Sequence, residues 1–273
     1  MKTGKFELPL GKKTLVMGIV NVTPDSFSDG GRFHHVDAAL RHAVQLVADG
    51  ADILDIGGES TVPYGNNKPI GAEEEMERIL PVIERLVQEV SVPISVDTYK
   101  AVTAEGALRL GAHIINDVWG LQGDGDMAGV VAKYGVPVVV MHNQEHPGYD
   151  DLMADICAFL RRSITIAAEA GIPQERVIVD PGIGFAKTRS DNIMIIRYLR
   201  QLEELGCPIL LGTSRKSFIG TTLDLPPLDR VEGTAATVAI GIANGADIIR
   251  VHDVKQMSRV AKMADALVRE ELP

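Results

Sequence analysis

The sequence contains few cysteines and few aromatic residues, and it has no excess of positive charge. Cys157 and Cys207 are the two cysteines among 273 residues, so neither a disulfide framework nor a cysteine-rich zinc site is expected, and a reducing cytoplasm fits. The 27 lysines and arginines face 37 aspartates and glutamates, giving a net charge of −10. This balance disfavours nucleic acid or an anionic membrane as a partner. If the substrate is an anion, we expect a few specifically positioned cationic side chains to bind it.

Long hydrophobic runs are also lacking. No stretch approaches the ~18 apolar residues of a transmembrane helix. The apolar run at residues 14–20 follows four lysines, but it is too short for a signal peptide, has no small-residue cleavage site and continues into NVTPD. We interpret it as a buried strand. Since no internal linker is visible, we expect residues 1–273 to form a single domain.

Short β-branched runs alternate with segments of helical periodicity. The runs are apolar on both faces, as parallel strands covered by helices must be. They recur about every 33 residues, which is the length of one βα unit. The eight runs lie at residues 14–20, 52–56, 93–96, 113–115, 136–141, 177–179, 208–211 and 247–251.

The segments between these runs predict helices, most of them followed by glycine or proline. They lie at about residues 36–49, 72–90, 99–110, 124–134, 151–170, 190–205, 229–244 and 256–270. In the first, we expect the strands to be faced by Val36, Leu40, Val44 and Val47. Eight repeats predict an α/β fold, a (β/α)8 TIM barrel. The alternative is a doubly wound open sheet, but the residues after the first strand are not the glycine-rich phosphate turn that it needs.

Polar residues follow all eight predicted strands, where the chemistry of a barrel lies. Any one of them could be a helix cap, but eight ends converging on one mouth indicate a site. In chain order they are Asn21, Asp25, Glu59, Ser60, Thr61, Asp97, Asn116, Asp117, His142, Asn143, Asp180, Ser214, Arg215, Lys216, Ser217, Arg250 and His252.

The residue types at the mouth suggest two subsites. Carboxylates and an amide, from Asp97, Asn116 and Asp180, suit a flat heterocycle rich in N–H donors. A metal site is the rival interpretation, although only His142 and His252 are expected to reach the mouth.

The cationic end of the mouth suggests the second subsite. Lys216, Arg250 and His252 follow the last two strands, where barrels commonly bind phosphate. The alternative for Arg250 is a purely structural pairing with a mouth carboxylate. Asp253 is expected to cap the last helix.

Two further features of the sequence have simple interpretations. Residues 24–31 and 61–71 are long loops that we interpret as lids. We interpret both cysteines as packing residues.

Several of these segments together resemble the signatures of the dihydropteroate synthase family. In order, they are MGIVNVTPDSFSDGG (17–31), DIGGEST (55–61), SVDT (95–98), INDV (115–118), DPGIGF (180–185), SRKS (214–217) and RVHD (250–253). The resemblance implies a TIM barrel, a homodimer and Mg²⁺. It further implies the condensation of 6-hydroxymethyl-7,8-dihydropterin pyrophosphate with 4-aminobenzoate to give 7,8-dihydropteroate, at a site targeted by sulfonamides.

The resemblance also implies roles for individual residues. Asp97, Asn116, Asp180 and Lys216 would hold the pterin, and Arg250 and His252 the pyrophosphate, with Arg250 also stacking on the pterin; catalysis would rest on Asp97, Lys216, Arg250 and His252. Asn21 would bind Mg²⁺, and Thr61 would contact the pyrophosphate. 4-Aminobenzoate would be framed by Phe27, Pro63, Phe185 and Ser217.

The departure from the family pattern that matters most lies in one loop. Val62 stands where the family usually has arginine, and Lys68 is a candidate substitute for the missing charge. Ala186 stands where glycine is common. Two other functions remain open beside the synthase. One is a methyltetrahydrofolate:corrinoid methyltransferase, which needs no pyrophosphate site, and the other is a non-catalytic pterin-binding paralogue.

Overall fold

The computed structural model describes residues 1–23, 32–59 and 69–269. Within these residues, eight parallel strands are hydrogen-bonded in the order β8-β7-β6-β5-β4-β3-β10-β9, and a bridge between Val179 and Ile209 brings β8 beside β9. The sheet therefore curls into the predicted barrel and is not the doubly wound alternative. Its strands are β3 (Leu15–Asn21), β4 (Ile53–Gly57), β5 (Ile94–Asp97), β6 (Ile114–Asp117), β7 (Val138–Met141), β8 (Val177–Asp180), β9 (Leu210–Leu211) and β10 (Ile248–Val251).

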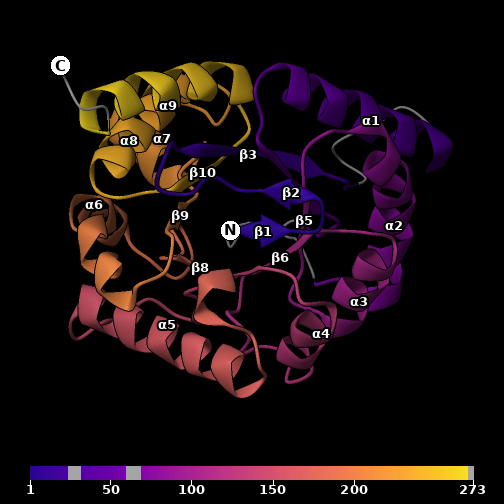
Figure 1. Cartoon of the computed structure of the whole chain (residues 1–273). Helices are drawn as coiled ribbons and strands as arrows, with labels where there is room; N and C mark the ends of the chain where they lie inside the picture. Colours follow the sequence, from indigo (N-terminus) through magenta and orange to yellow (C-terminus); the bar gives the residue numbers. More distant parts are fainter. Residues whose placement is uncertain (24–31, 60–68, 270–273) are drawn as a thin grey trace.

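The helices surround the strands as an outer ring (Figure 1). They are α1 (Arg32–Ala48), α2 (Ala72–Glu89), α3 (Ala101–Arg109), α4 (Met127–Tyr134), α5 (Leu152–Glu169), α6 (Arg189–Arg197), α7 (Ser217–Leu223), α8 (Val231–Ala243) and α9 (Val254–Val268), with 3-10 turns η2 (Gln174–Arg176) and η3 (Leu199–Leu205). The predicted helix at 190–205 is thus α6 followed by η3. Neither α7 nor η2 was predicted, because one or two turns offer too few positions for a periodic pattern.

A short hairpin crosses the barrel at the amino ends of the strands. Its strands are β1 (Lys2–Thr3) and β2 (Phe6–Glu7), which lie at the centre of Figure 1. The Thr3 hydroxyl donates to the backbone oxygen of His113, just before β6. Leu8 follows the hairpin and packs against the inward-facing residues Leu15, Met17, Ile53, Ile114, Val139, Ile178, Leu210 and Ile248. The hairpin therefore closes the end opposite the carboxyl ends of the strands.

The buried face of α1 differs from the predicted one. Ala39, Leu40, Ala43 and Leu46 are buried, whereas Val44 is 45% exposed. Steps of four residues advance 400° around a helix with 3.6 residues per turn, so the predicted row drifts away from the core. The Val44 prediction was therefore wrong.

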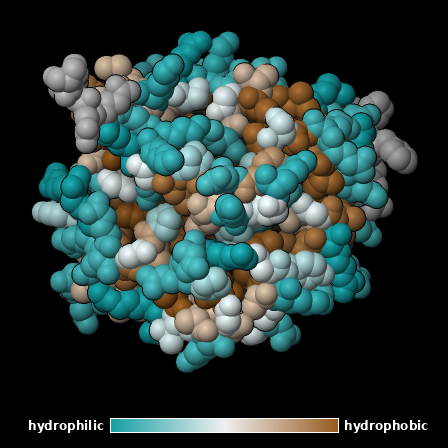
Figure 2. Space-filling view, in the orientation of Figure 1, coloured by the Kyte–Doolittle hydropathy of each residue, from teal (hydrophilic) through white to brown (hydrophobic). Residues whose placement is uncertain are grey.

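The hydropathy of the surface and of the helices, and the burial of the cysteines, can be compared with what the composition predicted. Figure 2 shows that the face around the N-terminal hairpin is covered mostly by hydrophilic residues, with smaller hydrophobic areas between them. Both Cys157 and Cys207 are buried, as predicted for packing residues. Across the described ranges, no helix combines the length and the apolar character needed to cross a membrane.

Candidate active site

Arg250 is the centre of a buried polar cluster at the carboxyl ends of the strands. Its Nε lies 2.6 Å from Oδ2 of Asp55, and its Nη2 lies 2.6 Å from Oδ2 of Asp97. The same Asp55 oxygen accepts a hydrogen bond of 3.0 Å from Nδ2 of Asn116. Four side chains from β10, β4, β5 and β6 therefore meet at one point. Arg250 thus pairs with mouth carboxylates, as the alternative interpretation of this residue required, while its side chain remains 20% exposed.

Three oxygens of this region have no hydrogen-bond partner among the described residues. They are Oδ1 of Asp55, Oγ of Ser95 and Oδ1 of Asp97, and all three are buried. An unsatisfied buried acceptor costs about 1–3 kcal/mol, so such atoms are retained where a ligand supplies the donor. The arrangement suits a ligand edge that carries several N–H groups.

Asp180 and Lys216 extend the cluster across the mouth. Oδ1 of Asp180 accepts from the backbone N–H of Gly182 at 2.7 Å, and Nζ of Lys216 lies 4.4 Å from the ring centroid of Phe185. Burial raises the pKa of Asp180 to about 6 and lowers the pKa of Lys216 to about 8. Burial also raises the pKa of Asp97 to about 7, while Arg250 opposes that shift.

His252 is held beside the cluster by Ser214. The hydroxyl oxygen of Ser214 lies 3.1 Å from the backbone nitrogen of His252 and 3.0 Å from its Nδ1. Burial, and then the charges of Arg250 and Arg215, lower the pKa of His252 to about 3. The imidazole is therefore neutral near pH 7. Ser217, which the sequence also placed here, is exposed at the first residue of α7.

Asp253 does not cap α9 as predicted. It occupies the N-cap position, but its side chain makes no capping hydrogen bond. Its two carboxylate oxygens instead accept from Nη2 and Nε of Arg215, at 2.6 and 3.0 Å. The pair is bidentate, which gives geometric specificity. It ties the segment after β9 to the segment after β10.

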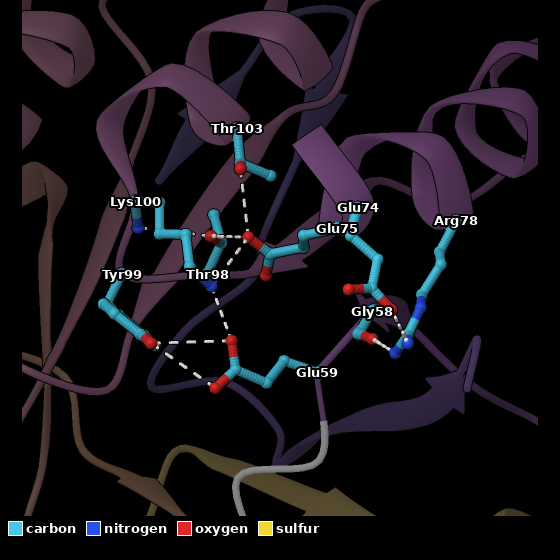
Figure 3. A network of polar contacts seen from close by, with 9 residues as sticks. All are labelled: Gly58, Glu59, Glu74, Glu75, Arg78, Thr98, Tyr99, Lys100 and Thr103. Carbon is cyan, nitrogen blue, oxygen red and sulfur yellow. Dashed lines mark hydrogen bonds and ion pairs between the residues drawn. The ribbon is translucent and has the colours of Figure 1, made fainter. Parts of the chain in front are cut away.

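Glu59 belongs to a separate network behind the mouth (Figure 3). Its carboxylate lies 2.5 Å from Nζ of Lys100, and the same ammonium lies 3.2 Å from Glu75 of α2. Glu75 is 1% exposed and also accepts from the hydroxyls of Thr98 and Thr103. The network joins the end of β4 to α2 and α3, so it supports the mouth from outside the barrel.

His142 lies away from the mouth, contrary to the prediction. It is 2% exposed, and its ring packs edge-on against Phe159 of α5 at 4.9 Å. Its Nδ1 lies 2.9 Å from Nζ of Lys187, which also donates to the backbone oxygen of Phe185. Burial lowers the pKa of Lys187 to about 7. The pair anchors the segment after β8, in which Ala186 has a φ of +46°, a region that glycine adopts most easily.

Asp55, Ser95 and Lys187 were not among the predicted site residues. Asp55 and Ser95 lie inside predicted strands, each between two apolar neighbours. A charged or polar residue within a run that is buried on both faces was the available signal, because such a residue needs a partner inside the barrel. For Lys187, nothing in the sequence distinguished it from a surface lysine.

Several predicted features lie outside the described residues. They are most of the two loops that we interpreted as lids and the residues Asp25, Phe27, Ser60, Thr61, Val62, Pro63 and Lys68. Asn21 is described: it ends β3 and its side chain is exposed. Residues 1–23, 32–59 and 69–269 contain no group of three or more His, Cys, Asp or Glu side chains placed to hold a metal ion.

The chain is similar to known proteins along most of its length. Residues 17–252 match the family described as pterin binding enzyme. A dihydropteroate synthase of Bacillus subtilis (strain 168) is 55% identical over 259 residues, covering 95% of this chain and 90% of that protein.

Solved structures give the same result. A dihydropteroate synthase of Clostridium difficile, crystallised in the presence of pteroic acid, is 50% identical, with a TM-score of 0.94 over 97% of this chain and 100% of the other. A Xanthomonas albilineans dihydropteroate synthase with 4-aminobenzoic acid is 43% identical, with a TM-score of 0.90 over 95% of this chain and 94% of the other.

Proposed function

The chain belongs to the pterin-binding enzyme family as a dihydropteroate synthase, a transferase, and we propose how its barrel mouth divides the work of that reaction. The enzyme condenses 6-hydroxymethyl-7,8-dihydropterin pyrophosphate with 4-aminobenzoate, giving 7,8-dihydropteroate and pyrophosphate. The observation that supports our assignment of residues is the buried cluster of Asp55, Asp97, Asn116 and Arg250, with its unsatisfied acceptors.

The pterin binds against Asp97, Asn116, Asp180 and Lys216. The free Oδ1 of Asp97 faces no donor among the described residues, so it can accept from an N–H of the pterin. The Lys216 ammonium can donate to a pterin oxygen or ring nitrogen. Each group is buried or partly buried, which strengthens its hydrogen bonds relative to those in water.

Arg250, His252 and Asp97 act on the reacting bond. As the C–O bond to pyrophosphate breaks, positive charge develops on the pterin methylene carbon, and the Asp97 carboxylate stabilises it. Burial opposes the charge of Arg250, but Asp55 and Asp97 hold its pKa above the ordinary value, so the guanidinium stays charged beside the departing anion. Besides binding the pyrophosphate, Arg250 stacks on the pterin ring. The amine of 4-aminobenzoate is neutral at pH 7; it forms the new C–N bond and then loses a proton, so no strong general base is required.

4-Aminobenzoate binds beside Phe185 and Ser217. The Phe185 ring is partly exposed next to Lys216, and the exposed Ser217 can donate to the carboxylate. We assign Phe27 and Pro63 to the same subsite and Thr61 to the pyrophosphate, as the family resemblance implies. The Xanthomonas structure with 4-aminobenzoic acid supports binding of this acid by the fold.

Mg²⁺ fits the donor set of the mouth. Magnesium is usually bound by one or two protein oxygens together with substrate phosphates and water, not by a complete protein cage. The exposed side chain of Asn21, at the carboxyl end of β3, offers one such oxygen. When bound, the ion neutralises charge on the leaving pyrophosphate.

We also propose that the protein is a cytoplasmic homodimer and that residues 1–273 form its single domain. We propose no nucleic-acid or membrane partner, and we expect sulfonamides to inhibit the enzyme.

The direct test is product formation from both substrates with Mg²⁺ and with EDTA. We expect dihydropteroate in Mg²⁺ only, and a loss of at least about 100-fold in kcat for Asp97→Asn, since a charge that acts in the transition state is removed. The control is Asp52→Asn, a substitution just before the amino end of β4 and away from the mouth. Pterin binding without product in the wild-type enzyme would instead identify a non-catalytic paralogue.

A further inference from the structure

Ser214 and His252 form a two-point contact between the segments after β9 and β10. The backbone N–H of His252 donates to Oγ of Ser214 at 3.1 Å, and the same oxygen lies 3.0 Å from Nδ1 of the ring. Ser214 is 6% exposed. The bidentate pair between Arg215 and Asp253 joins the same two segments one residue further along each, so the contact is held in register.

Only one placement of the hydrogen atoms lets the Ser214 hydroxyl make both contacts and leaves no hydrogen-bonding group unpaired. A serine hydroxyl has one hydrogen and two lone pairs, and the backbone N–H of His252 occupies a lone pair. If Nδ1 also carried a proton, the Ser214 hydrogen would have no acceptor among the hydrogen bonds of the described residues. If Nδ1 is unprotonated, that hydrogen is donated to it, and every group is satisfied.

We propose that Ser214 is a positioning residue that sets the tautomer of His252, keeping the ring proton on Nε2 for donation to the diphosphate of the substrate. The assignment to diphosphate rests on the proposed function, whereas the tautomer does not. A neutral imidazole has a single N–H, so the nitrogen that carries it decides whether His252 offers the ligand a donor or an acceptor.

The charges around His252 keep the ring neutral. Burial disfavours a second proton most, followed by the charges of Arg250, Arg215 and Lys216, whereas the carboxylate of Asp253 favours it. His252 would therefore contribute a directed hydrogen bond, while Arg250 supplies the positive charge.

The tautomer can be measured on the enzyme without substrate. In protein labelled with ¹⁵N-histidine, two-bond ¹H–¹⁵N correlations distinguish a protonated from an unprotonated ring nitrogen, and His252→Gln assigns the signal. We expect unprotonated Nδ1 and protonated Nε2 in the wild-type enzyme and in Ser214→Thr, and a mixture of tautomers in Ser214→Ala. Protonated Nδ1 in the wild-type enzyme, or the wild-type pattern retained in Ser214→Ala, would overturn the proposal.

Kinetics separate this proposal from the function on which it rests. We expect Ser214→Ala to lower kcat/KM for the pterin pyrophosphate about tenfold, with unchanged affinity for 7,8-dihydropteroate, which has no diphosphate. Ser214→Thr should recover most of the loss, and Ser258→Ala, whose hydroxyl contacts Asp49 far from the mouth, should match the wild-type enzyme. A changed tautomer with unchanged kcat/KM would refute the diphosphate contact and leave the tautomer assignment standing.

Discussion

Oδ2 of Asp55 lies 2.6 Å from Nε of Arg250 and 3.0 Å from Nδ2 of Asn116, so one carboxylate oxygen holds two residues of the proposed pterin site. Asp55 itself is fully buried in β4. Asp55 therefore orients Asn116 of β6 and Arg250 of β10 from β4, which lies between these two strands in the sheet. The guanidinium of Arg250 is thereby fixed before any substrate arrives, which is the preorganisation that transition-state stabilisation requires.

Asp55→Asn should reduce catalysis without abolishing folding. The amide keeps the shape of the carboxylate but loses its charge, so Arg250 is left with Asp97 alone. We expect kcat/KM for the pterin substrate to fall about 10- to 100-fold, corresponding to roughly 1.4–2.7 kcal/mol. Steady-state kinetics measure it. The control is Asp52→Asn, which removes a carboxylate that is paired with Lys13 just before the amino end of β4. Equal kinetics in the two variants would contradict the positioning role.

The activity should decline at alkaline pH because Lys216 loses its proton. Burial lowers the pKa of this ammonium to about 8, so the cation is present below that pH and is lost above it. A profile of kcat/KM between pH 6 and 9.5 should therefore show a descending limb near pH 8. Lys216→Met should have low activity with no such limb. A limb that persists in this variant would assign the titration to another group.

Lys100→Met should destabilise the protein strongly. The ammonium of Lys100 neutralises Glu75, which is 1% exposed, and Glu59, whose side chain is 12% exposed. Removing one partner leaves buried charge uncompensated, and we expect the free energy of unfolding to fall by about 3 kcal/mol. Lys133→Met is the matched control, because its pair with Glu105 is on the surface. Urea denaturation of both variants tests the contrast, and similar midpoints would show that the network contributes little.

Two glycine-to-alanine substitutions, one in α4 and one at its C-cap, should change the free energy of unfolding with opposite signs. Gly129 is inside the helix. Apart from its chain neighbours and the helix backbone, no atom of the described residues lies within 4 Å of the position that an added methyl group would occupy, so Gly129→Ala should raise the free energy of unfolding by about 1 kcal/mol. Gly135 ends the helix with a φ of +63°, which disfavours any residue with a Cβ atom, so Gly135→Ala should lower it by about 1 kcal/mol. Thermal denaturation provides the comparison. Shifts of the same sign would contradict the assigned C-cap.

The sequence alone determined the barrel and the set of polar strand ends. Apolar runs about 33 residues apart are a local property of the chain, and parallel strands in such a series have few other ways to bury both faces. For the same reason Asp97, Asn116, Asp180 and Arg250 could be placed at one mouth, since the carboxyl ends of barrel strands lie together. The family signatures then indicated the reaction, because they occur in order along nearly the whole chain.

Only the tertiary structure decided which polar groups meet. Asp55 bonds to Arg250, 195 residues away, and Lys187 bonds to His142, 45 residues away. Asp253 pairs with Arg215 and does not cap its own helix. The ring of His142 packs outward against α5. In the sequence, however, His142 directly follows a predicted strand, as the residues of the mouth do. Side-chain direction at a strand end depends on the pleat and on the packing of neighbouring elements, and neither is encoded within a few residues of the chain.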